Sequence, residues 1–379
     1  MTKIVYFITD LDIGGAEKSL FQLATRLPRD EFCVEVITLT SGGRIAKWLE
    51  QEGIPVTSLD IERFWDLAGV FRLRRLLKSS KPHILHTFLF HANIVGRIAA
   101  AGLRYCAVIS SVRVAERRFK WHLALDWLTS PFMDLEVCVS EGVYRFTQMR
   151  AKIPRKKLTV IPNGIDLDEF ERKDLRLQAR ELRNSLRISP DAPLILTIGR
   201  LERQKGISYF LLAAREVLQE FPEARFLIVG EGPDKRRLIS QVRDLGIEYA
   251  VGFLGFRDDV PQILAPADIF VLASLWEGMP NVVLEAMASG KPVVGTQVEG
   301  TEELVVPGET GILVPTADAK MLAQGISRLI REPDLAGKMA QAARKRVSED
   351  YTIQKMVERY AQLYRDILKE KAPPSRIKK

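Results

Sequence analysis

The sequence contains little of what disulfide frameworks, metal sites and membrane spans are built from. It has three cysteines, four histidines and no Cys-x-x-Cys pair. No apolar run approaches the ~18 residues of a membrane span. The odd cysteine total argues against a disulfide framework, and we expect Cys33, Cys106 and Cys138 to be small buried residues of strands in a reducing compartment. A β-rich run at 4–9 begins without a signal-peptide pattern, so we expect a cytoplasmic protein.

Acidic residues are in deficit, and the deficit is uneven. The 379 residues carry a formal charge of +8. Residues 1–168 hold 24 Lys and Arg against 18 Asp and Glu, and the tail 369–379 holds five against one. Basic clusters occur at Arg72, Arg74, Arg75, Lys78 and Lys81, at Arg117, Arg118 and Lys120, and at Lys152, Arg155, Lys156 and Lys157.

Aromatic residues accompany two of these clusters. Phe64 and Trp65 precede the first, and Phe119, Trp121 and Trp127 are interleaved with the second. Basic and aromatic residues together favour contact with an anionic membrane, at the inner face of the cytoplasmic membrane, or with a lipid-diphosphate acceptor. A helix at 70–77 that packs its apolar side on a sheet would explain the first cluster equally well. No recognition motif accompanies the charge, so we expect no nucleic-acid partner.

Short β-rich runs alternate with helical patterns along the chain, in two series. The first series lies at 4–9, 34–40, 84–87, 108–111 and 135–140, and the second at 194–198, 225–229, 251–254, 269–273, 292–296 and 311–314. Such alternation predicts α/β domains with parallel sheets. We therefore predict two Rossmann-like domains, joined by the polar segment 163–191.

Two carboxylates eight residues apart surround a predicted helix start. Pro280 and Asn281 open a helix at 282–289, with Asn281 as N-cap. The backbone N–H groups between Glu277 and Glu285 would form an anion-binding helix terminus. This arrangement suits a ligand that carries both sugar hydroxyls and phosphate. An ordinary capped surface helix has the same pattern.

Two cations follow the strand predicted at 194–198. They lie in the turn Gly199-Arg200…Lys205-Gly206, at the strand end where open α/β sheets bind ligands. We expect both to line a solvated cleft, where they would stabilise the charge that grows on a departing diphosphate. A solvated basic turn is the alternative.

Together these motifs resemble the retaining glycosyltransferases of family 4, which have the GT-B fold. Two further stretches match that family, Gly14-Gly15-Ala16-Glu17 and Ile161-Pro-Asn-Gly-Ile-Asp166, and the resemblance extends from Lys3 to about Leu368. It implies an acceptor-binding domain at 1–168 and a nucleotide-sugar-binding domain at 169–351, with their sheets facing across a cleft. It also implies a C-terminal helix, within about 352–379, that crosses back to the first domain.

The resemblance also implies a reaction. A sugar would move, with retention, from a UDP- or GDP-linked donor to a hydroxyl of a glycan or lipid-linked glycan in cell-envelope or exopolysaccharide biosynthesis. No metal or other cofactor is expected, since Arg200 and Lys205 supply the positive charge.

The family's donor contacts map onto named positions of this chain. Arg200 and Lys205 would hold the diphosphate, Glu285 the ribose hydroxyls and Glu277 the sugar. The remaining donor contacts would be Gly14, Gly15, Gly255, Phe256, Gly278, Met279, Pro280 and Asn281.

In the first domain, His91 and Arg113 are candidates for contact with acceptor or sugar. His91 could equally have a capping or packing role. Many relatives carry a histidine where Arg113 stands, after the strand at 108–111, so a permanent cation would face an anionic group or the sugar here. His83 and His86 lie near by in sequence, but no carboxylate joins them at metal-ligand spacing.

Two other functions fit parts of the pattern. A GT-B sugar-nucleotide epimerase would use the same nucleotide site but needs acid/base carboxylates of its own. A non-catalytic sugar-nucleotide-binding scaffold would keep the glutamates and lose the cations. The presence of Arg200 and Lys205 favours a transferase.

Overall fold

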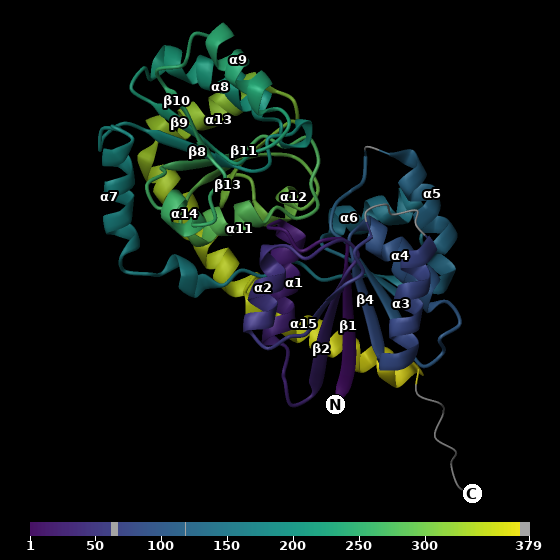
Figure 1. Cartoon of the computed structure of the whole chain (residues 1–379). Coiled ribbons are helices and arrows are strands. Elements are labelled where there is room, and N and C mark those ends of the chain that lie inside the picture. Colours follow the sequence, from purple (N-terminus) through teal and green to yellow (C-terminus); the bar gives the residue numbers. More distant parts are fainter. Residues whose placement is uncertain (62–66, 118, 372–379) are drawn as a thin grey trace, which may run out of the picture. The chain divides into compact units, whose positions relative to one another are not determined.

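The structure is a computed structural model that describes residues 1–61, 67–117 and 119–371. The chain divides into two compact units, Met1–Gly164 with the C-terminal segment from Ile353, and Ile165–Thr352. Each unit contains one parallel sheet with helices around it (Figure 1). The first division, after Gly164, lies four residues before the boundary proposed from the sequence after residue 168. The second, after Thr352, lies one residue beyond the boundary proposed after residue 351.

The first unit has a seven-stranded sheet in the order β3-β2-β1-β4-β5-β6-β7, with every pair parallel. Its strands are β1 (Thr2–Ile8), β2 (Phe32–Thr38), β3 (Val56–Ser58), β4 (Ile84–Phe88), β5 (Ala107–Val112), β6 (Leu135–Cys138) and β7 (Leu158–Val160). The sequence pattern did not indicate β3 and β7. Each has three residues and lies at a sheet edge, too short for a period to be recognised.

Helices of the first unit connect these strands. They are α1 (Gly15–Arg26), α2 (Arg44–Gln51), α3 (Leu67–Ser80), α4 (Phe90–Ala100), α5 (Lys120–Thr129) and α6 (Glu141–Phe146), with shorter turns η1 (Ser130–Phe132), η2 (Thr147–Ala151) and η3 (Arg155–Lys157). None of the helices in the described part of the chain is both long and apolar enough to cross a bilayer.

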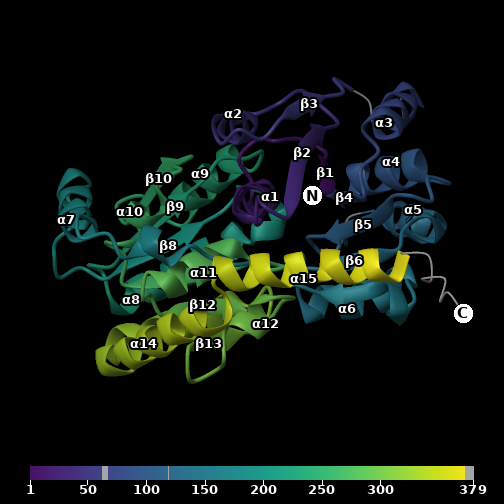
Figure 2. The ribbon, with the colours of Figure 1, turned by 90° about the horizontal axis from the view of Figure 1, so that it is seen from below.

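The last helix, α15 (Ile353–Lys371), belongs to the first unit and runs along it (Figure 2). Its buried side chains, including Tyr360 and Tyr364, join the same core as Ile4 and Tyr6 of β1. The Tyr364 hydroxyl lies 2.7 Å from His86 Nδ1 and 3.1 Å from the Tyr6 hydroxyl. The prediction that the C-terminal helix crosses back to the first domain is confirmed.

The second unit has a six-stranded parallel sheet in the order β10-β9-β8-β11-β12-β13. Its strands are β8 (Leu194–Ile198), β9 (Arg225–Val229), β10 (Val251–Gly255), β11 (Ile269–Leu272), β12 (Val293–Thr296) and β13 (Gly311–Val314). The strand order reverses between β8 and β11, as it does between β1 and β4 in the first unit. The predicted fold class, two Rossmann-like α/β domains, is confirmed.

The helices of the second unit are η4 (Leu167–Phe170), α7 (Leu175–Ser185), η5 (Arg203–Lys205), α8 (Ile207–Glu220), α9 (Lys235–Asp244), α10 (Val260–Leu264), α11 (Asn281–Ala288), α12 (Thr301–Leu304), α13 (Ala319–Arg331) and α14 (Pro333–Asp350). The predicted connecting segment lies largely within this unit. Arg183 of α7 holds it to the sheet, with Nη2 2.8 Å from both Asp268 Oδ2 and the Pro266 carbonyl oxygen.

The cysteines only partly follow the sequence prediction. Cys106 and Cys138 are buried, and burial raises the pKa of each thiol, that of Cys106 to about 12. Cys33 lies in β2 but is exposed, because its side chain points away from the core near the start of the strand. Cys106 precedes β5 instead of lying in it. The prediction of three buried strand cysteines is therefore wrong for Cys33 and for the placement of Cys106.

Candidate functional site

The main candidate site lies at the carboxyl ends of β8 and β11. These strands are neighbours and parallel, so the chain leaves both at the same edge of the sheet. The order of the sheet reverses here, and such a reversal point is where ligands of doubly wound sheets bind. The loops 199–206 and 273–280 therefore meet, although about 70 residues separate them.

Lys205 and Glu277 form an ion pair where these two loops meet. Lys205 Nζ lies 2.6 Å from Glu277 Oε1, and the Ser274 hydroxyl donates to the same oxygen at 2.7 Å. The Glu277 side chain is 6% exposed and that of Lys205 20%. Because both groups are largely removed from water, their attraction is screened far less than that of a surface pair.

Main-chain contacts hold the two loops together. Leu275 N–H donates to the Gln204 carbonyl oxygen at 2.8 Å, and the Gln204 side chain donates to the Trp276 carbonyl oxygen at 3.0 Å. Gly206 has φ +59°, and a Cβ there would lie 2.0 Å from the Ala273 carbonyl oxygen. The second glycine of the Gly-Arg…Lys-Gly turn is therefore needed for both its left-handed backbone and the approach of the neighbouring loop.

The loop after β12 supports the other side of residues 273–280. Gly300 has φ +72°, and a Cβ there would lie 2.2 Å from the Gly278 carbonyl oxygen. Thr296 donates its hydroxyl proton to the Ser274 carbonyl oxygen at 2.6 Å. The segment that bears Glu277 is thus held from both neighbouring loops, which pre-organises its carboxylate.

Arg200 and Lys205 do not share one environment, contrary to the expectation that both line a solvated cleft. The Arg200 side chain is 71% exposed, with Nε 4.0 Å from Glu202 Oε2. Lys205 is four-fifths buried because the turn η5 directs it back to Glu277. Of these two cations, Lys205 is held by the shorter ion pair, 2.6 Å to Glu277 Oε1.

Helix α11 begins one residue earlier than predicted. Asn281 is its first residue, Pro280 is the N-cap, and no side chain caps the terminus. Asn281 as N-cap is therefore a wrong prediction, since the restricted backbone of Pro280 already provides the extended geometry of a cap. Gly290, with φ +63°, follows the C-cap Ser289.

Glu285 lies one turn into α11 and is 8% exposed. It is four residues after Asn281 and so lies on the same face of the helix. Gly278, Met279 and Pro280 are buried and connect Glu277 to the start of the helix.

Gly255 ends β10 and Phe256 follows it, at the same edge of the sheet. Gly255 has φ +70° and its carbonyl oxygen accepts from Gly230 N–H at 2.8 Å. Phe256 is 42% exposed. An exposed aromatic ring at this edge can stack with a planar ligand group.

In the first unit, the first turn of α1 contains a buried carboxylate that the sequence did not single out. Glu17 is 8% exposed, and a Cβ on Gly14 would lie 2.2 Å from Glu17 Oε2. Burial raises the pKa of Glu17 to about 7; Asp10 and Asp12 add to this rise, while Arg113 opposes it. Gly14 therefore leaves room for the carboxylate of its own helix.

Arg113 follows β5 and is anchored by Asn163 of the Ile-Pro-Asn-Gly motif. Its guanidinium donates to Asn163 Oδ1 and also bonds the Tyr360 hydroxyl of α15. Burial lowers the pKa of Arg113. Asn163, 3% exposed, also accepts from Ser19 of α1 at 3.4 Å. The mid-chain motif thus positions Arg113 between α1 and α15.

A pocket opens beside Arg113, lined by Leu89, Phe90, Leu123, Phe146, His122 and Asp126 among others. His91 packs edge-on against Phe90 and His122, with ring centroids 5.3 and 6.1 Å away, and burial together with His122 lowers its pKa. His86 is fully buried and bonds Tyr364 and Ser111. These contacts give His86 a packing role and leave Arg113 as the candidate that lines the pocket.

Among the residues that the structure describes, no group of three or more His, Cys, Asp or Glu is placed to hold a metal ion. Asp10 and Asp12 form an Asp-x-Asp pair, in which the Asp12 backbone N–H donates a hydrogen bond to Asp10 Oδ1 at 3.2 Å. Phe64, Trp65 and Arg118, parts of the basic and aromatic clusters, lie outside the described residues, as does 372–379.

Sequence reasoning missed Ser274, Glu17 as an individual residue, and the role of Asn163. A signal was present for Glu17, because an acidic residue in the first turn after two glycines can fold back over them. Ser274 contacts Glu277 three residues away, whereas the contact of Glu277 with Lys205 requires β8 and β11 to be neighbours.

Two family models match the chain. The model described as "Glycosyltransferase Family 4" matches residues 13–169, and that described as "Glycosyl transferases group 1" matches residues 178–346.

Named relatives and solved structures agree with these models. An Escherichia coli UDP-Gal:alpha-D-GlcNAc-diphosphoundecaprenol alpha-1,3-galactosyltransferase is 28% identical over 95% of both chains. A Salmonella typhimurium glycosyltransferase, WcaL, named for colanic acid biosynthesis, is 30% identical over 76% of this chain and 72% of its own. The fold is similar to that of Anabaena HepE, crystallised with UDP and glucose, with a TM-score of 0.86, 24% identity and coverage of 97% of this chain and 100% of HepE.

Proposed function

The chain belongs to the family 4, group 1 glycosyltransferases, and from this premise we propose that it transfers a sugar, with retention, from a nucleotide diphosphate sugar to a hydroxyl of a glycan or lipid-linked glycan. The observation that carries the proposal is the buried Lys205–Glu277 pair at the reversal point of the second sheet. It places a fixed cation and a hydroxyl-binding carboxylate side by side, as a sugar joined to a diphosphate requires.

The names of similar proteins support the finer parts of the proposal. The Escherichia coli relative is named for a UDP-linked donor and a diphosphoundecaprenol acceptor, and WcaL for colanic acid. HepE was crystallised with UDP. We therefore favour a UDP-linked over a GDP-linked donor and a lipid-linked acceptor in envelope polysaccharide assembly.

The residues of the second unit divide the donor among them. Lys205 donates one hydrogen bond to Glu277, which leaves its other N–H groups to bind the diphosphate. Exposed Arg200 binds the same diphosphate when the donor is present. Glu277 Oε1 is occupied by Lys205 and Ser274, so the other carboxylate oxygen accepts from sugar hydroxyls. Glu285 binds the ribose, and Gly255 and Phe256 meet the nucleobase. Backbone groups of Gly278, Met279 and Asn281 complete the contacts, while Pro280 has no N–H to offer.

Retention follows in this proposal from displacement on one face of the sugar. The bond between the anomeric carbon and the diphosphate oxygen breaks as the acceptor oxygen attacks from the same side, and the departing phosphate takes the acceptor's proton. Lys205 and Arg200 stabilise the charge that develops on the diphosphate. They supply what a divalent ion would, so the reaction is proposed to need no metal.

The first unit is proposed to bind the acceptor, with Arg113 beside the pocket facing an anionic group or the sugar. The lipid-linked acceptor implies contact with an anionic membrane, at the inner face of the cytoplasmic membrane. The basic residues of this unit would provide attraction that weakens as salt screens them.

A donor panel tests the proposal. Purified protein is incubated with UDP- and GDP-sugars, with and without lipid-linked acceptors, and nucleotide release is measured. Acceptor-dependent release with retained anomeric configuration, unchanged by EDTA, is expected. Conversion of the donor sugar without acceptor would indicate an epimerase, and binding without release a scaffold. Loss of activity in EDTA that Mg²⁺ restores would contradict metal independence.

Substitution of the two glutamates tests the division of roles. Glu285→Gln should weaken binding of free nucleotide diphosphate about tenfold, since the ribose is present in that ligand. Glu277→Gln should act mainly on the complete donor sugar and on turnover. Calorimetry with nucleotide alone checks this, and equal weakening by both variants would refute the assignment.

A further inference from the structure

Helix α5 exposes three large apolar side chains and directs most of its polar side chains toward the unit. An amphipathic helix on a protein surface normally does the opposite. Residues 122, 126 and 129 point toward the unit, whereas residues 121, 127 and 128 are exposed. The contacts of the inner face and the composition of the outer face explain this inversion.

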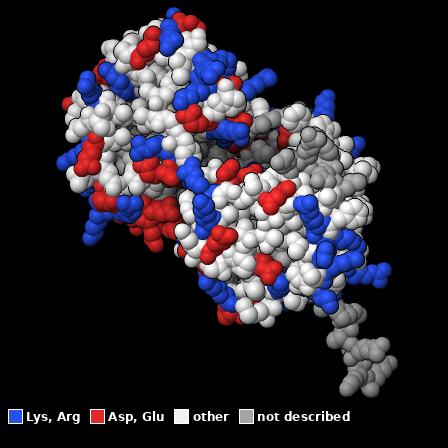
Figure 3. All heavy atoms as spheres, in the orientation of Figure 1, with Lys and Arg blue, Asp and Glu red and all other residues white. Residues whose placement is uncertain are grey.

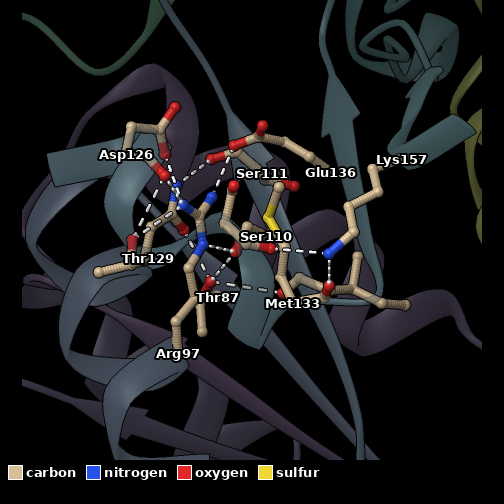
Figure 4. Close-up of polar contacts among 12 residues, drawn as sticks. Thr87, Arg97, Ser110, Ser111, Asp126, Thr129, Met133, Glu136 and Lys157 are labelled. Atoms are coloured by element: carbon tan, nitrogen blue, oxygen red, sulfur yellow. Dashed lines mark hydrogen bonds and ion pairs between the residues drawn. The ribbon is translucent and has the colours of Figure 1, made fainter. Parts of the chain in front are cut away.

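The inner face is held by buried charge. Arg97 of α4 is completely buried, and its Nη1 lies 2.5 Å from Asp126 Oδ1 and 3.3 Å from the Thr129 hydroxyl oxygen. Its Nη2 lies 2.7 Å from Glu136 Oε1 of β6 (Figure 4). His122 Nδ1 lies 3.3 Å from Glu116 Oε2. Charge-assisted hydrogen bonds therefore fix α5 through its polar side, and Trp121, Trp127 and Leu128 remain exposed.

The outer face is a contiguous apolar surface. Trp121 is 44% exposed, Trp127 56% and Leu128 61%, and Phe132 of η1 is 47% exposed. At 100° per residue, positions 121, 124, 127 and 128 fall within one third of the helix circumference. Single exposed apolar residues are ordinary, but a continuous patch of large ones indicates an interaction surface.

Exposed basic residues lie next to α5 in the sequence and on the turn that packs against it. Arg117 and Lys120 precede the patch and are exposed. The turn η2 packs against α5, and exposed Met149, Arg150 and Lys152 lie on or directly after it. In Figure 3 a second group of Lys and Arg side chains lies over α3. The surface of α5 thus combines Trp, Leu and Phe with a cationic rim.

We propose that α5 and η1 form a membrane-inserting face, with Trp121, Trp127, Leu128 and Phe132 in the headgroup region of an anionic bilayer. Tryptophan prefers that region, and the cationic rim matches anionic headgroups. The alternative occupant is a second copy of the chain. A two-fold contact of α5 with itself would place two cationic rims together, which is unfavourable. The inference rests on the membrane contact proposed above and assigns it to one surface.

Matched surface variants test this assignment. Trp127→Ser/Leu128→Ser removes the face, and Tyr249→Ser/Leu177→Ser is the control, because Tyr249 and Leu177 are each 61% exposed in the second unit. Sedimentation with phosphatidylcholine vesicles, with and without phosphatidylglycerol, measures binding. We expect wild type and control to bind the anionic vesicles, and the face variant to bind about tenfold more weakly. All three should have the same circular dichroism spectrum and closely similar thermal unfolding, which shows that both units remain folded.

The other outcomes are distinct. Equal vesicle binding by the face variant and wild type would refute the α5 assignment but leave membrane contact standing. No binding of wild type to anionic vesicles would refute both. A concentration-dependent dimer that the face variant abolishes would show that a second copy occupies the surface. The glycosyl-transfer proposal is tested separately by nucleotide release, so its failure is distinguishable from these results.

Discussion

At the scale of single residues, the Lys205–Glu277 pair combines a stability role with the catalytic role proposed for it. Glu277 is almost completely removed from water, and its Oε1 depends on Lys205 and Ser274. A buried carboxylate that loses its cation is costly, whereas loss of an exposed cation is not. Lys205 and Arg200 can therefore be separated experimentally.

Lys205→Ala should lower turnover by about 10²-fold and also reduce the free energy of unfolding by about 1–3 kcal/mol. Arg200→Ala, the control at a 71% exposed side chain, should lower turnover similarly but change stability by less than about 0.5 kcal/mol. Steady-state kinetics and urea unfolding measure the two effects. Near-normal turnover in either variant would show that its side chain is not needed for the leaving group.

Glu17 should make the stability of the first unit pH-dependent. Its pKa is raised from 4.5 to about 7, so the folded state binds this proton more tightly than the unfolded state. The stabilisation is complete below pH 4.5 and is lost as the pH rises through about 7, a change of about 3 kcal/mol.

The variant Glu17→Gln should abolish that part of the pH dependence, because an amide does not titrate. Thermal unfolding between pH 5 and pH 8 measures it, with exposed Glu50→Gln of α2 as control. A wild-type profile that Glu17→Gln leaves unchanged would mean that Glu17 is ionised throughout this range in the folded protein.

At the scale of elements, the C-terminal helix α15 completes the core of the first unit. Its Tyr364 is completely buried and bonds His86 of β4 and Tyr6 of β1. An ion pair of Arg365 with Glu31, 2.6 Å, adds an exposed contact of small value. The aromatic packing and the buried hydrogen bonds therefore hold this helix.

Tyr364→Ala should reduce the free energy of unfolding by about 3–5 kcal/mol, because it leaves a cavity and removes a partner of two buried groups. Gln362→Ala, an exposed position two residues away, should change it by less than about 0.5 kcal/mol. Urea unfolding of both variants checks this, and similar values would show that α15 contributes little to the core.

At the scale of the whole molecule, the two units differ in how they use the chain. The second unit is the continuous segment Ile165–Thr352, whereas the first needs the segment after Ile353 to complete its core. A fragment of residues 165–352 should therefore fold alone and bind nucleotide diphosphate. A fragment of residues 1–164 should expose apolar core and unfold at lower temperature than the same fragment with residues 353–371 added.

Circular dichroism and thermal unfolding of the fragments test this difference. Calorimetry with nucleotide diphosphate gives the binding readout for the second fragment. Cooperative unfolding of residues 1–164 that is insensitive to residues 353–371 would contradict the role assigned to α15.

The sequence by itself determined the class of fold, because strand and helix periods report local backbone geometry. It located the second-unit strands within about a residue, and its glycines marked loops that approach closely, as Gly206 does at Ala273. The family motifs also identified Lys205 and Glu277 as candidates, and the structure places them in contact.

Only the tertiary structure decided which distant side chains meet and which faces are buried. The Lys205–Glu277 contact depends on β11 lying next to β8, and the separate environments of Arg200 and Lys205 follow from the turn between them. The inversion of α5 depends on the buried Arg97. Strand order and buried charge pairing are non-local, so no period or spacing along the chain records them.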